Sequence, residues 1–378
     1  MSRALCRMCS LPLGSERLLH FGNMPKAAQF LPNADSLAQD AGVDLDIYQC
    51  AACGLVQTGN APVPYYKEVV RAAAFSAEMK EFRHEQFAAF VRKHGLLGKK
   101  LLEVGCGRGE YLSLFQEEGV DAYGIEYAEP SVAHCMAQGL NAACGFIDSA
   151  DYAVPHAPFD AFAVLSFLEH WPDPNAGLRG IAHNLSDDGI GLVEVPNFDM
   201  ILNKNLFAEF ISDHLCYFTR DTLQTLLRLN GFEVIECNEV WHGYILSAVV
   251  RKRKPCDVSA FAVSRLKLQH EFRDVIRQHG AQGIAIWGAG HQALAMIALL
   301  ELAGEIDYVV DSAPFKQNRF TPASHIPIVA PERLNTHPVA LIIVMAASYS
   351  DEVARYIRRE WGNSMRVAIL REDGLQLV

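Results

Sequence analysis

The sequence predicts an α/β fold in which two strand–turn–helix units follow a small N-terminal segment with paired cysteines. Two observations predict the units: the stretches Lys100–Glu110 and Gly283–Ala293 each hold a short apolar run that ends in closely spaced glycines. A third observation, two Cys-x-x-Cys pairs, sets the N-terminal segment apart. A chain of 378 residues is long enough for two or three domains. We expect them at 1–70, 71–253 and 254–378.

The composition is that of an ordinary globular protein, with 50% hydrophobic and 20% charged residues. The formal net charge of -11 argues against a nucleic-acid backbone or an anionic membrane as the main partner. No apolar run reaches the roughly 20 residues of a membrane-spanning helix, and the first residues lack the apolar core of a signal peptide. We therefore expect a cytoplasmic protein that binds neither nucleic acid nor membrane.

The two cysteine pairs predict a zinc site. Zinc takes four thiolates in a tetrahedron, and two facing pairs of identical spacing supply that geometry. The alternatives are four buried free cysteines or a redox pair. No neighbouring residue is of the kind that activates water, so we expect a structural ion that replaces a core too small to form alone. The expected ligands are Cys6, Cys9, Cys50 and Cys53.

A glycine-rich turn follows the first apolar strand of the central domain. Gly105 and Gly107 let the backbone come close to a ligand, and the following helix offers its free amides to that ligand. The next predicted strand, Asp121–Glu126, ends in a carboxylate of the kind that accepts hydrogen bonds from ribose hydroxyls. Glycines alone are weak evidence. The ordered set of Glu103, the glycines and an acid at the tip of the next strand is more specific.

This ordered set resembles the cofactor-binding start of class I S-adenosylmethionine (SAM) methyltransferases. The resemblance implies a Rossmann-like SAM domain in which Gly105 and Gly107 lie under the amino acid and the sugar of SAM, and Glu126 holds the ribose. An acid at the place of Asp148 commonly meets the adenine amino group in such enzymes. The expected cofactor site is completed by Glu103, Cys106, Tyr127, Ser166 and Leu168.

Aromatic residues at helix-like intervals between Tyr65 and Gly95 predict a helix that leads into the central domain. We interpret these aromatics as core. The stretch 69–76, just upstream of the glycine-rich strand, is a candidate lid over the cofactor.

Polar residues follow the apolar strand Phe159–Ser166. Ligands of open α/β sheets bind just past the carboxyl ends of the strands, so we expect Glu169 and His170 near the site. The other interpretation of His170 is a packing or loop-bracing histidine, and the sequence leaves both open.

A long segment after the next buried strand holds the best acid/base candidate, Asp213 beside His214. An imidazole titrates near neutrality, and a carboxylate nearby can orient it and stabilise its charged form. The alternative is that His214 only caps the helix expected to begin near Thr219. Tyr217 or Asn197 could stabilise a developing oxyanion.

The order of these pieces resembles the sugar C-methyltransferase family, which modifies nucleotide-linked deoxysugars. Its marks are the cysteine pairs, Glu-Val-Gly-Cys-Gly, Phe-Leu-Glu-His, Glu-Val-Pro-Asn, Asp-His-Leu-Cys-Tyr-Phe and the long stretch Val310–Ile328. The resemblance implies that zinc, SAM and C-terminal α/β domains follow one another, with His214 as catalytic base.

Two departures from the family leave the acceptor and the methylated atom open. Asp213 and Ile211 stand where the family often has Glu and Tyr, and the candidate lid lacks the family's tyrosines. Methylation at oxygen or nitrogen is therefore an alternative to methylation at carbon.

In the last domain, Gly288 and Gly290, with Asp311 at the end of the next strand, fit the dinucleotide-binding pattern Gly-x-Gly-x-x-Ala followed by an acid. Alone, this pattern suggests a nicotinamide (NAD) enzyme, but no dehydrogenase catalytic set is visible. We interpret the domain as a half-Rossmann module that helps to bind a nucleotide sugar. The candidate contacts are Trp287 and His291 for base or sugar, and Lys316 and Arg319 for phosphates. For the last two, a solvated loop is the alternative.

The sequence thus predicts a SAM-dependent methyltransferase of a nucleotide-linked keto or deoxy sugar, with structural zinc. An NAD-dependent enzyme and an inactive scaffold are the rival hypotheses. A nucleotide sugar is the expected small-molecule partner, and the chain is expected to be a monomer or a homodimer.

Overall fold

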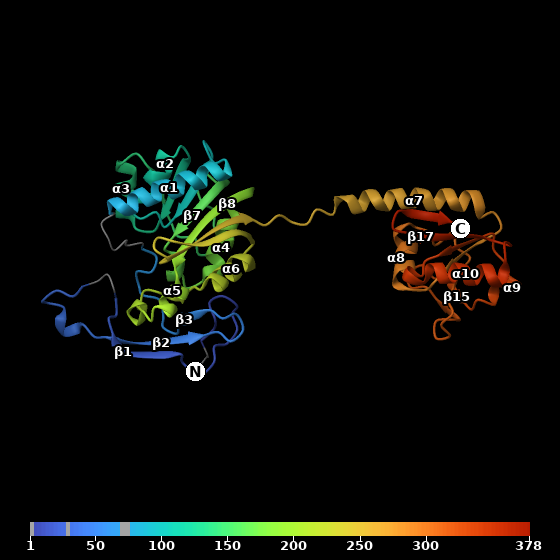
Figure 1. Ribbon diagram of the computed structural model, residues 1–378, viewed down its shortest axis with the longest axis horizontal. Helices are drawn as coiled ribbons and strands as arrows, with labels where there is room; N and C mark the ends of the chain where they lie inside the picture. Colours follow the sequence, from blue (N-terminus) through green and yellow to red (C-terminus); the bar gives the residue numbers. More distant parts are fainter. Residues whose placement is uncertain (1–3, 28–30, 69–75) are drawn as a thin grey trace. The chain divides into compact units, whose positions relative to one another are not determined.

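The computed structural model describes residues 4–27, 31–68 and 76–378. The candidate lid, except for Ser76, lies outside these residues. The chain forms two compact units, Met1–Lys254 and Pro255–Val378 (Figure 1). Each is described by itself. Among the described helices, none combines the length and the apolarity that crossing a bilayer requires.

The first unit is built on a seven-stranded sheet with the order β10-β11-β8-β7-β4-β5-β6. The pairs among β4 to β8 are parallel, and β11 and β10 close one edge as antiparallel strands. The order reverses at β4, which lies between β5 and β7. Open α/β sheets bind ligands at such a reversal, outside the carboxyl ends of the strands. The strands are β4 (Lys100–Val104), β5 (Asp121–Glu126), β6 (Asn141–Cys144), β7 (Phe159–Leu165), β8 (Leu185–Pro196), β10 (Phe232–Val240) and β11 (Ile245–Lys252).

Helices cover both faces of this sheet, because successive side chains of a strand point to opposite faces. On β4, Leu102 packs in one core with residues of α4 and α6, whereas Leu101 packs in a second core with residues of α1 and α2. The helices are α1 (Ala77–His94), α2 (Glu110–Glu117), α3 (Glu129–Ala137), α4 (Pro174–His183), α5 (Phe198–Asn203) and α6 (Arg220–Leu229).

The predicted connecting helix is α1, but it begins only at Ala77, and the described residues 65–68 form a turn instead of helix. Ser76 caps α1 by accepting a hydrogen bond from the Met79 amide at 3.1 Å. Phe87 is fully buried and stacks on Phe115 of α2 with ring centroids 3.9 Å apart. Of the aromatics in the predicted helix, Phe75 lies outside the described residues.

A small antiparallel sheet, β1-β2-β3-β9, lies beside the large one within the same unit (Figure 1). Three of its strands come from the N-terminal segment, but β9 comes from the stretch that carries His214. Val56 pairs with Tyr217 and Gln57 with Cys216, so the N-terminal segment holds the residues next to His214 in place. The strands are β1 (Leu19–Met24), β2 (Val43–Gln49), β3 (Val56–Thr58) and β9 (Cys216–Tyr217).

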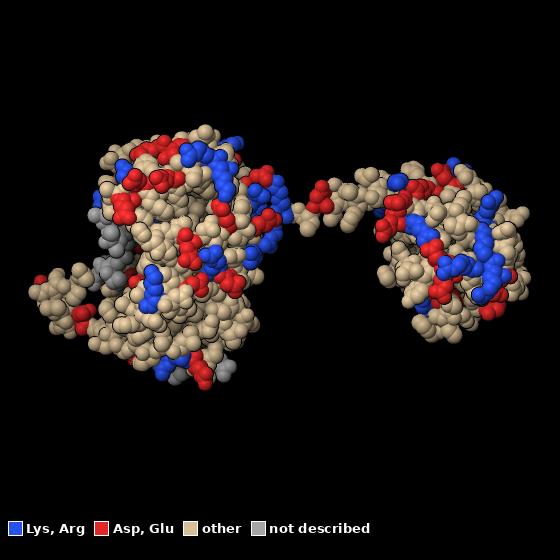
Figure 2. Space-filling view, in the orientation of Figure 1, with Lys and Arg blue, Asp and Glu red and all other residues tan. Residues whose placement is uncertain are grey.

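Acidic and basic side chains are interspersed on the face shown in Figure 2.

The second unit has its own seven-stranded sheet, β14-β15-β13-β12-β16-β17-β18, and two apolar cores. Its inner strands are parallel, and β14 and β18 are antiparallel edges. The strands are β12 (Ile284–Trp287), β13 (Tyr308–Val310), β14 (Arg319–Phe320), β15 (Pro327–Val329), β16 (Leu341–Val344), β17 (Arg366–Arg371) and β18 (Gly374–Leu377). The helices are α7 (Ser259–His279), α8 (His291–Leu299), α9 (Arg333–Thr336) and α10 (Ser350–Trp361).

Candidate active site

The glycine-rich turn after β4 is organised by Glu126, the last residue of β5. Glu126 accepts a hydrogen bond from the Gly107 amide at 3.0 Å and another from the Ala128 amide at 2.9 Å. Gly105 and Gly107 have φ angles of 73° and 57°, which favour glycine. A carboxylate offers about four acceptor positions, so these two bonds are compatible with a bound ribose.

A pocket opens beside this carboxylate. Its walls include Gly105, Glu126 and Tyr127 together with three aromatic residues, Phe146, Phe167 and Trp171. Aromatic walls suit the flat adenine ring of SAM, and the carboxylate suits its ribose. The residue types that line the pocket therefore fit the cofactor, although the pocket measures only about 10 Å³ in this structure.

Lys67 also lines this pocket, although no sequence pattern predicted it as a site residue. Its Nζ lies 3.2 Å from Asp148 Oδ2 and 5.0 Å from the ring centroid of Phe146. A basic residue directly after Tyr65 and Tyr66 is weak evidence for a site residue, because the local sequence does not indicate which strand end its side chain reaches. The structure thus puts Asp148 and a lysine together at the pocket rim.

The other predicted cofactor residues lie along the same edge of the sheet. Glu103 and Cys106 are buried within and directly after β4. Ser166 directly follows β7, has a φ of 51° and donates its amide proton to the Glu194 carbonyl at 2.9 Å. Leu168 is fully buried in the short helix η2 (Leu168–His170).

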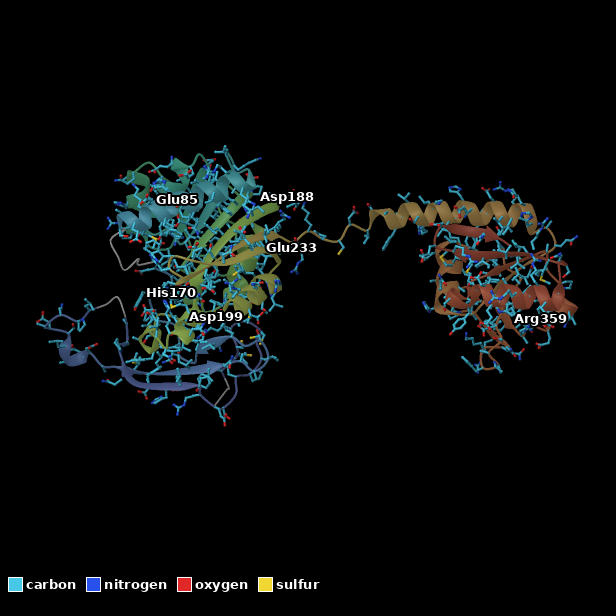
Figure 3. The ribbon with its side chains drawn as sticks, in the orientation of Figure 1. Glu85, His170, Asp188, Asp199, Glu233 and Arg359 are labelled. Atoms are coloured by element: carbon cyan, nitrogen blue, oxygen red, sulfur yellow. The ribbon has the colours of Figure 1, made fainter. Side chains whose placement is uncertain are left out.

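Helix η2 connects the cofactor pocket to a pair of histidines. Phe167 lines the pocket, and its ring centroid is 6.3 Å from that of His170. The rings of His170 and His214 are 4.9 Å apart in an edge-to-face arrangement. One ligand atom each from Glu169, His170 and His214 lie within 4.8 Å of one another. Figure 3 shows His170 between the large and the small sheet of the first unit.

Hydrogen bonds fix the orientation of His170. Its Nδ1 lies 2.8 Å from the backbone oxygen of Asp213 and donates to it, because a carbonyl can only accept. The carboxylate of Asp213 accepts from the hydroxyl of Tyr65 at 2.7 Å. Tyr65 was not among the predicted site residues, since no sequence pattern connects positions 148 residues apart.

Burial determines the protonation of this cluster. It lowers the pKa of His214 to about 3, with the neighbouring His170 as second cause, and it also lowers the pKa of His170. Burial raises the pKa of the Glu169 carboxyl to about 8. The Glu169 Oε2 has no hydrogen-bond partner among the described residues. At neutral pH the cluster therefore holds two neutral imidazoles, the form that a general base requires, and a protonated carboxyl.

Three further observations concern the same segment. The cap of α6 is Thr219, which forms a reciprocal capping box with Thr222, so His214 is not the cap of that helix. Tyr217 is buried, and its hydroxyl bonds the Ile211 backbone at 3.2 Å. Asn197 caps α5, and its side-chain amide donates to the Gly243 carbonyl at 2.8 Å. The side chains of Tyr217 and Asn197, the two groups predicted to stabilise an oxyanion, thus both form hydrogen bonds within the fold.

The four N-terminal cysteines converge in one cluster. All four sulfurs lie within 4.8 Å of one another, and the pairs Cys6–Cys53 and Cys9–Cys50 are each 3.5 Å apart. Four thiolates around zinc stand about 3.8 Å apart when each Zn–S bond is about 2.3 Å. Burial raises the pKa of the Cys6 and Cys53 thiols, whereas at Cys50 hydrogen bonds from the backbone of Cys53 and Ala52 outweigh burial and lower the pKa to about 7. The cluster fits a tetrahedral zinc ion.

In the second unit, Asp311 follows β13 and accepts from the Ala289 amide at 2.8 Å and from Lys316 Nζ at 2.8 Å. His291 begins α8, and Arg319 lies on the edge strand β14, both exposed. Trp287 is buried against Tyr356 and Trp361 of α10. The turn after β12 is thus tied to Asp311 and, through it, to Lys316, while Trp287 points into the core.

A buried ion pair that the sequence did not indicate joins α1 to β8. Arg83 bonds Glu194, and both side chains are almost completely buried. The guanidinium also lies 4.9 Å from the ring centroid of Tyr111. The sequence around Arg83 does not predict that this arginine is buried or which carboxylate it bonds.

Comparison with known proteins identifies two domains. A methyltransferase domain model matches residues 76–237, and a C-methyltransferase C-terminal domain model matches residues 254–369. The C-methyltransferase NovU of Streptomyces niveus is 24% identical over 92% of this chain and 90% of its own length. A ubiquinone biosynthesis O-methyltransferase of Idiomarina loihiensis is 35% identical over 26% of this chain and 44% of its own length. Among solved structures, PH0226 protein from Pyrococcus horikoshii OT3 has a TM-score of 0.41 and 14% identity, covering 50% of this chain and 98% of that one.

Proposed function

Because the chain belongs to the SAM-dependent methyltransferases that carry a C-methyltransferase C-terminal domain, we propose that it methylates a carbon atom of a nucleotide-linked keto sugar. The observation that carries the proposal is the pair of neutral imidazoles, His170 and His214, one aromatic side chain away from the candidate cofactor pocket. A carbon acid next to a ketone needs such a base.

SAM, when bound, supplies the electrophilic methyl group. His214 takes a proton from the carbon beside the ketone, and His170, held by the Asp213 carbonyl, keeps the facing ring in place. Burial keeps His214 neutral and ready to accept the proton, but it also makes the imidazolium costly. The enolate that forms beside the imidazolium offsets this cost by charge attraction in a site of low dielectric constant.

Positioning of the reacting groups supplies the rest of the rate acceleration. The rigid edge of the sheet holds the methyl donor at Glu126 and the glycine turn, while β9, pinned to β3, holds the base. Fixing both partners converts a bimolecular step into an effectively unimolecular one.

We further propose one structural zinc ion at the four-cysteine cluster, supported by the spacing of the sulfurs. For the nucleotide part of the acceptor we propose the second unit, with His291, Lys316 and Arg319 as contacts. Trp287, the fourth contact expected from the sequence, packs its ring against Tyr356 and Trp361.

Methylation at oxygen is the second candidate, because part of the central domain is 35% identical to a ubiquinone O-methyltransferase. One assay separates the two. The full-length protein is incubated with SAM carrying an isotope-labelled methyl group and a panel of nucleotide-linked keto sugars, and the labelled product is analysed by mass spectrometry and NMR. A methyl group correlated to a ring carbon supports the proposal, and one bound through oxygen supports the second candidate.

A further inference from the structure

The ammonium group of Lys67 lies among groups that attract a cation. Its Nζ is 3.2 Å from Asp148 Oδ2. Ring centroids lie 5.0, 5.4 and 6.0 Å from the same atom, those of Phe146, Tyr127 and Tyr66. The negative face of an aromatic ring attracts an ammonium at such distances. A carboxylate and aromatic rings thus hold the end of this side chain in one place.

The place of this ammonium is also part of the candidate cofactor pocket. Lys67, Tyr127 and Phe146 all line that pocket. The resemblance to SAM methyltransferases assigns the adenine amino group to Asp148, and aromatic walls suit the adenine ring. The ammonium therefore uses the carboxylate and two of the rings that adenine would contact.

With Lys67 in this position the pocket is too small for the cofactor. Its volume is about 10 Å³, the space of roughly one water molecule, whereas small-molecule sites measure about 300–1,000 Å³. Phe167 and Trp171 also line the pocket, but both are buried in the core. The side chain of Lys67 is 27% exposed and has a flexible four-carbon stem, so this wall can withdraw into solvent.

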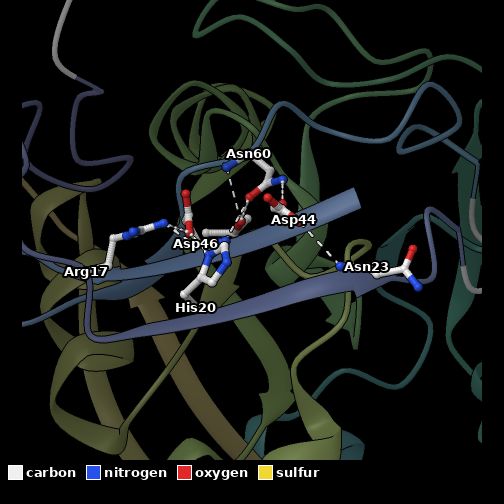
Figure 4. Close-up of polar contacts among 7 residues, drawn as sticks. Arg17, His20, Asn23, Asp44, Asp46 and Asn60 are labelled. Atoms are coloured by element: carbon white, nitrogen blue, oxygen red, sulfur yellow. Dashed lines mark hydrogen bonds and ion pairs between the residues drawn. The ribbon is translucent and has the colours of Figure 1, made fainter. Parts of the chain in front are cut away.

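The backbone that leads to Lys67 is anchored at two places. Asn60 donates its side-chain amide to the Asp44 carbonyl of β2 at 2.7 Å (Figure 4). Tyr65, two residues before Lys67, donates its hydroxyl to Asp213 at 2.7 Å. Withdrawal of the ammonium therefore requires rotation of one side chain, and the two anchors can stay in place.

We infer that Lys67 sets the affinity of the cofactor site by competing with adenine, because its ammonium occupies the place of the adenine ring until SAM binds. The inference rests on the part of the proposed function that assigns this pocket to SAM, and it does not depend on the acceptor. The apparent affinity of a ligand falls with the fraction of protein in the binding-competent state, and Lys67 lowers that fraction.

The test measures binding to the full-length protein by calorimetry, with SAM, S-adenosylhomocysteine and adenosine as ligands. Lys67→Ala removes the competing ammonium, and Lys67→Arg keeps a cation that also pairs with carboxylates and stacks on rings. Lys99→Ala is the control, because it removes an exposed lysine directly before β4, away from the glycine turn at the other end of that strand. Denaturant unfolding verifies that each variant is folded.

We expect Lys67→Ala to bind all three ligands about 3- to 30-fold more tightly than the wild type, the range that a partly exposed ion pair and its cation–π contacts account for. Lys67→Arg and Lys99→Ala should stay close to the wild type. Raising the salt concentration from about 0.05 to 0.5 M should tighten the binding of adenosine to the wild type, because salt screens the pair of Lys67 with Asp148 and adenosine is uncharged. Lys67→Ala should not show this salt dependence.

Two results would overturn the inference. Weaker binding of adenosine by folded Lys67→Ala would make Lys67 a ligand of the cofactor instead of a competitor. Equal affinities and equal salt dependence in Lys67→Ala and Lys99→Ala would show that the ammonium does not occupy the place of adenine. Either result leaves the methylation of a sugar carbon untouched, since no acceptor is present in the experiment. A wild type that binds neither SAM nor adenosine would remove the cofactor site of the proposed function and this inference with it.

Discussion

At the scale of single residues, burial decides the chemistry of the candidate site. Glu169, His170 and His214 would all be charged or partly charged in water at pH 6, but in this cluster burial favours the neutral form of each. The sequence shows that these residue types are present, whereas their protonation depends on the walls that only the fold supplies.

The proposed base gives the first prediction. His214→Ala should lower turnover by about 10²–10⁴-fold, the usual contribution of a positioned base, with unchanged affinity for SAM. Exchange of the proton beside the ketone with deuterated water should disappear as well. His183→Ala, at an exposed histidine of α4, is the control. Normal turnover in His214→Ala would show that the base lies elsewhere, with His170 as the next candidate.

The buried carboxyl of Glu169 gives a prediction on stability. Its pKa is about 8 in the folded protein against an ordinary value of 4.5, so between these values the folded state keeps a proton that the unfolded state has lost. Stability should therefore fall by about 1.4 kcal/mol per pH unit as the pH rises through this window. Glu169→Gln cannot ionise, so its stability relative to wild type should increase across the window. Denaturant unfolding at both ends of the window measures this, with the exposed Glu85→Gln as control. An equal difference at every pH would contradict it.

Some contacts between residues of the site can be predicted from the sequence, and others cannot. Gly107 and Glu126 end adjacent parallel strands, and the carboxyl ends of such strands meet at one edge, so their proximity could be predicted. The bond between Tyr65 and Asp213 spans 148 residues and depends on a sheet formed by two distant segments. Local patterns carry no information on such a contact.

At the scale of elements, the fold class could be predicted because each unit repeats a strong local pattern, an apolar strand followed by glycines and a helix. The contribution of β9 to the N-terminal sheet could not, because two residues, Cys216 and Tyr217, are too short a run to show a strand period. This pairing is nevertheless what attaches the candidate base to the N-terminal segment.

The attachment of α1 to β8 gives a prediction on stability at this scale. Arg83→Met should destabilise the protein by about 3–5 kcal/mol, because it leaves the Glu194 carboxylate buried without its cation. Adding Glu194→Gln should recover part of the loss. On the same helix, Lys93→Met removes an exposed pair with Glu236 and should cost about 1 kcal/mol or less. Equal losses for Arg83→Met and Lys93→Met, measured by denaturant unfolding, would contradict the assignment.

At the scale of the whole molecule, each compact unit has its own sheet and cores, which suggests that each folds by itself. The fragment Met1–Lys254 should therefore bind SAM with an affinity close to that of the full chain, but lose affinity for free nucleoside diphosphates. Calorimetry on fragment and full chain measures both. Undiminished binding of the diphosphates by the fragment would place the nucleotide in the first unit.

The proposed zinc ion connects the N-terminal segment to activity. Metal analysis should find one zinc per chain, and Cys50→Ser should loosen the sheet β1-β2-β3-β9 that holds the segment of His214. Turnover should then fall more than SAM affinity, since the glycine turn and Glu126 lie on the other sheet. Metal-free native protein with four freely reactive thiols would refute the site.

Transfer of a methyl group from SAM to a sugar carbon can be read from the structure of the labelled product. Full-length protein is supplied with isotope-labelled SAM and nucleotide-linked keto sugars in deuterated water. We expect a labelled methyl group on a ring carbon next to the ketone, together with loss of the proton that this carbon carried. A labelled methyl group on oxygen or nitrogen, with every carbon-bound proton retained, would contradict it.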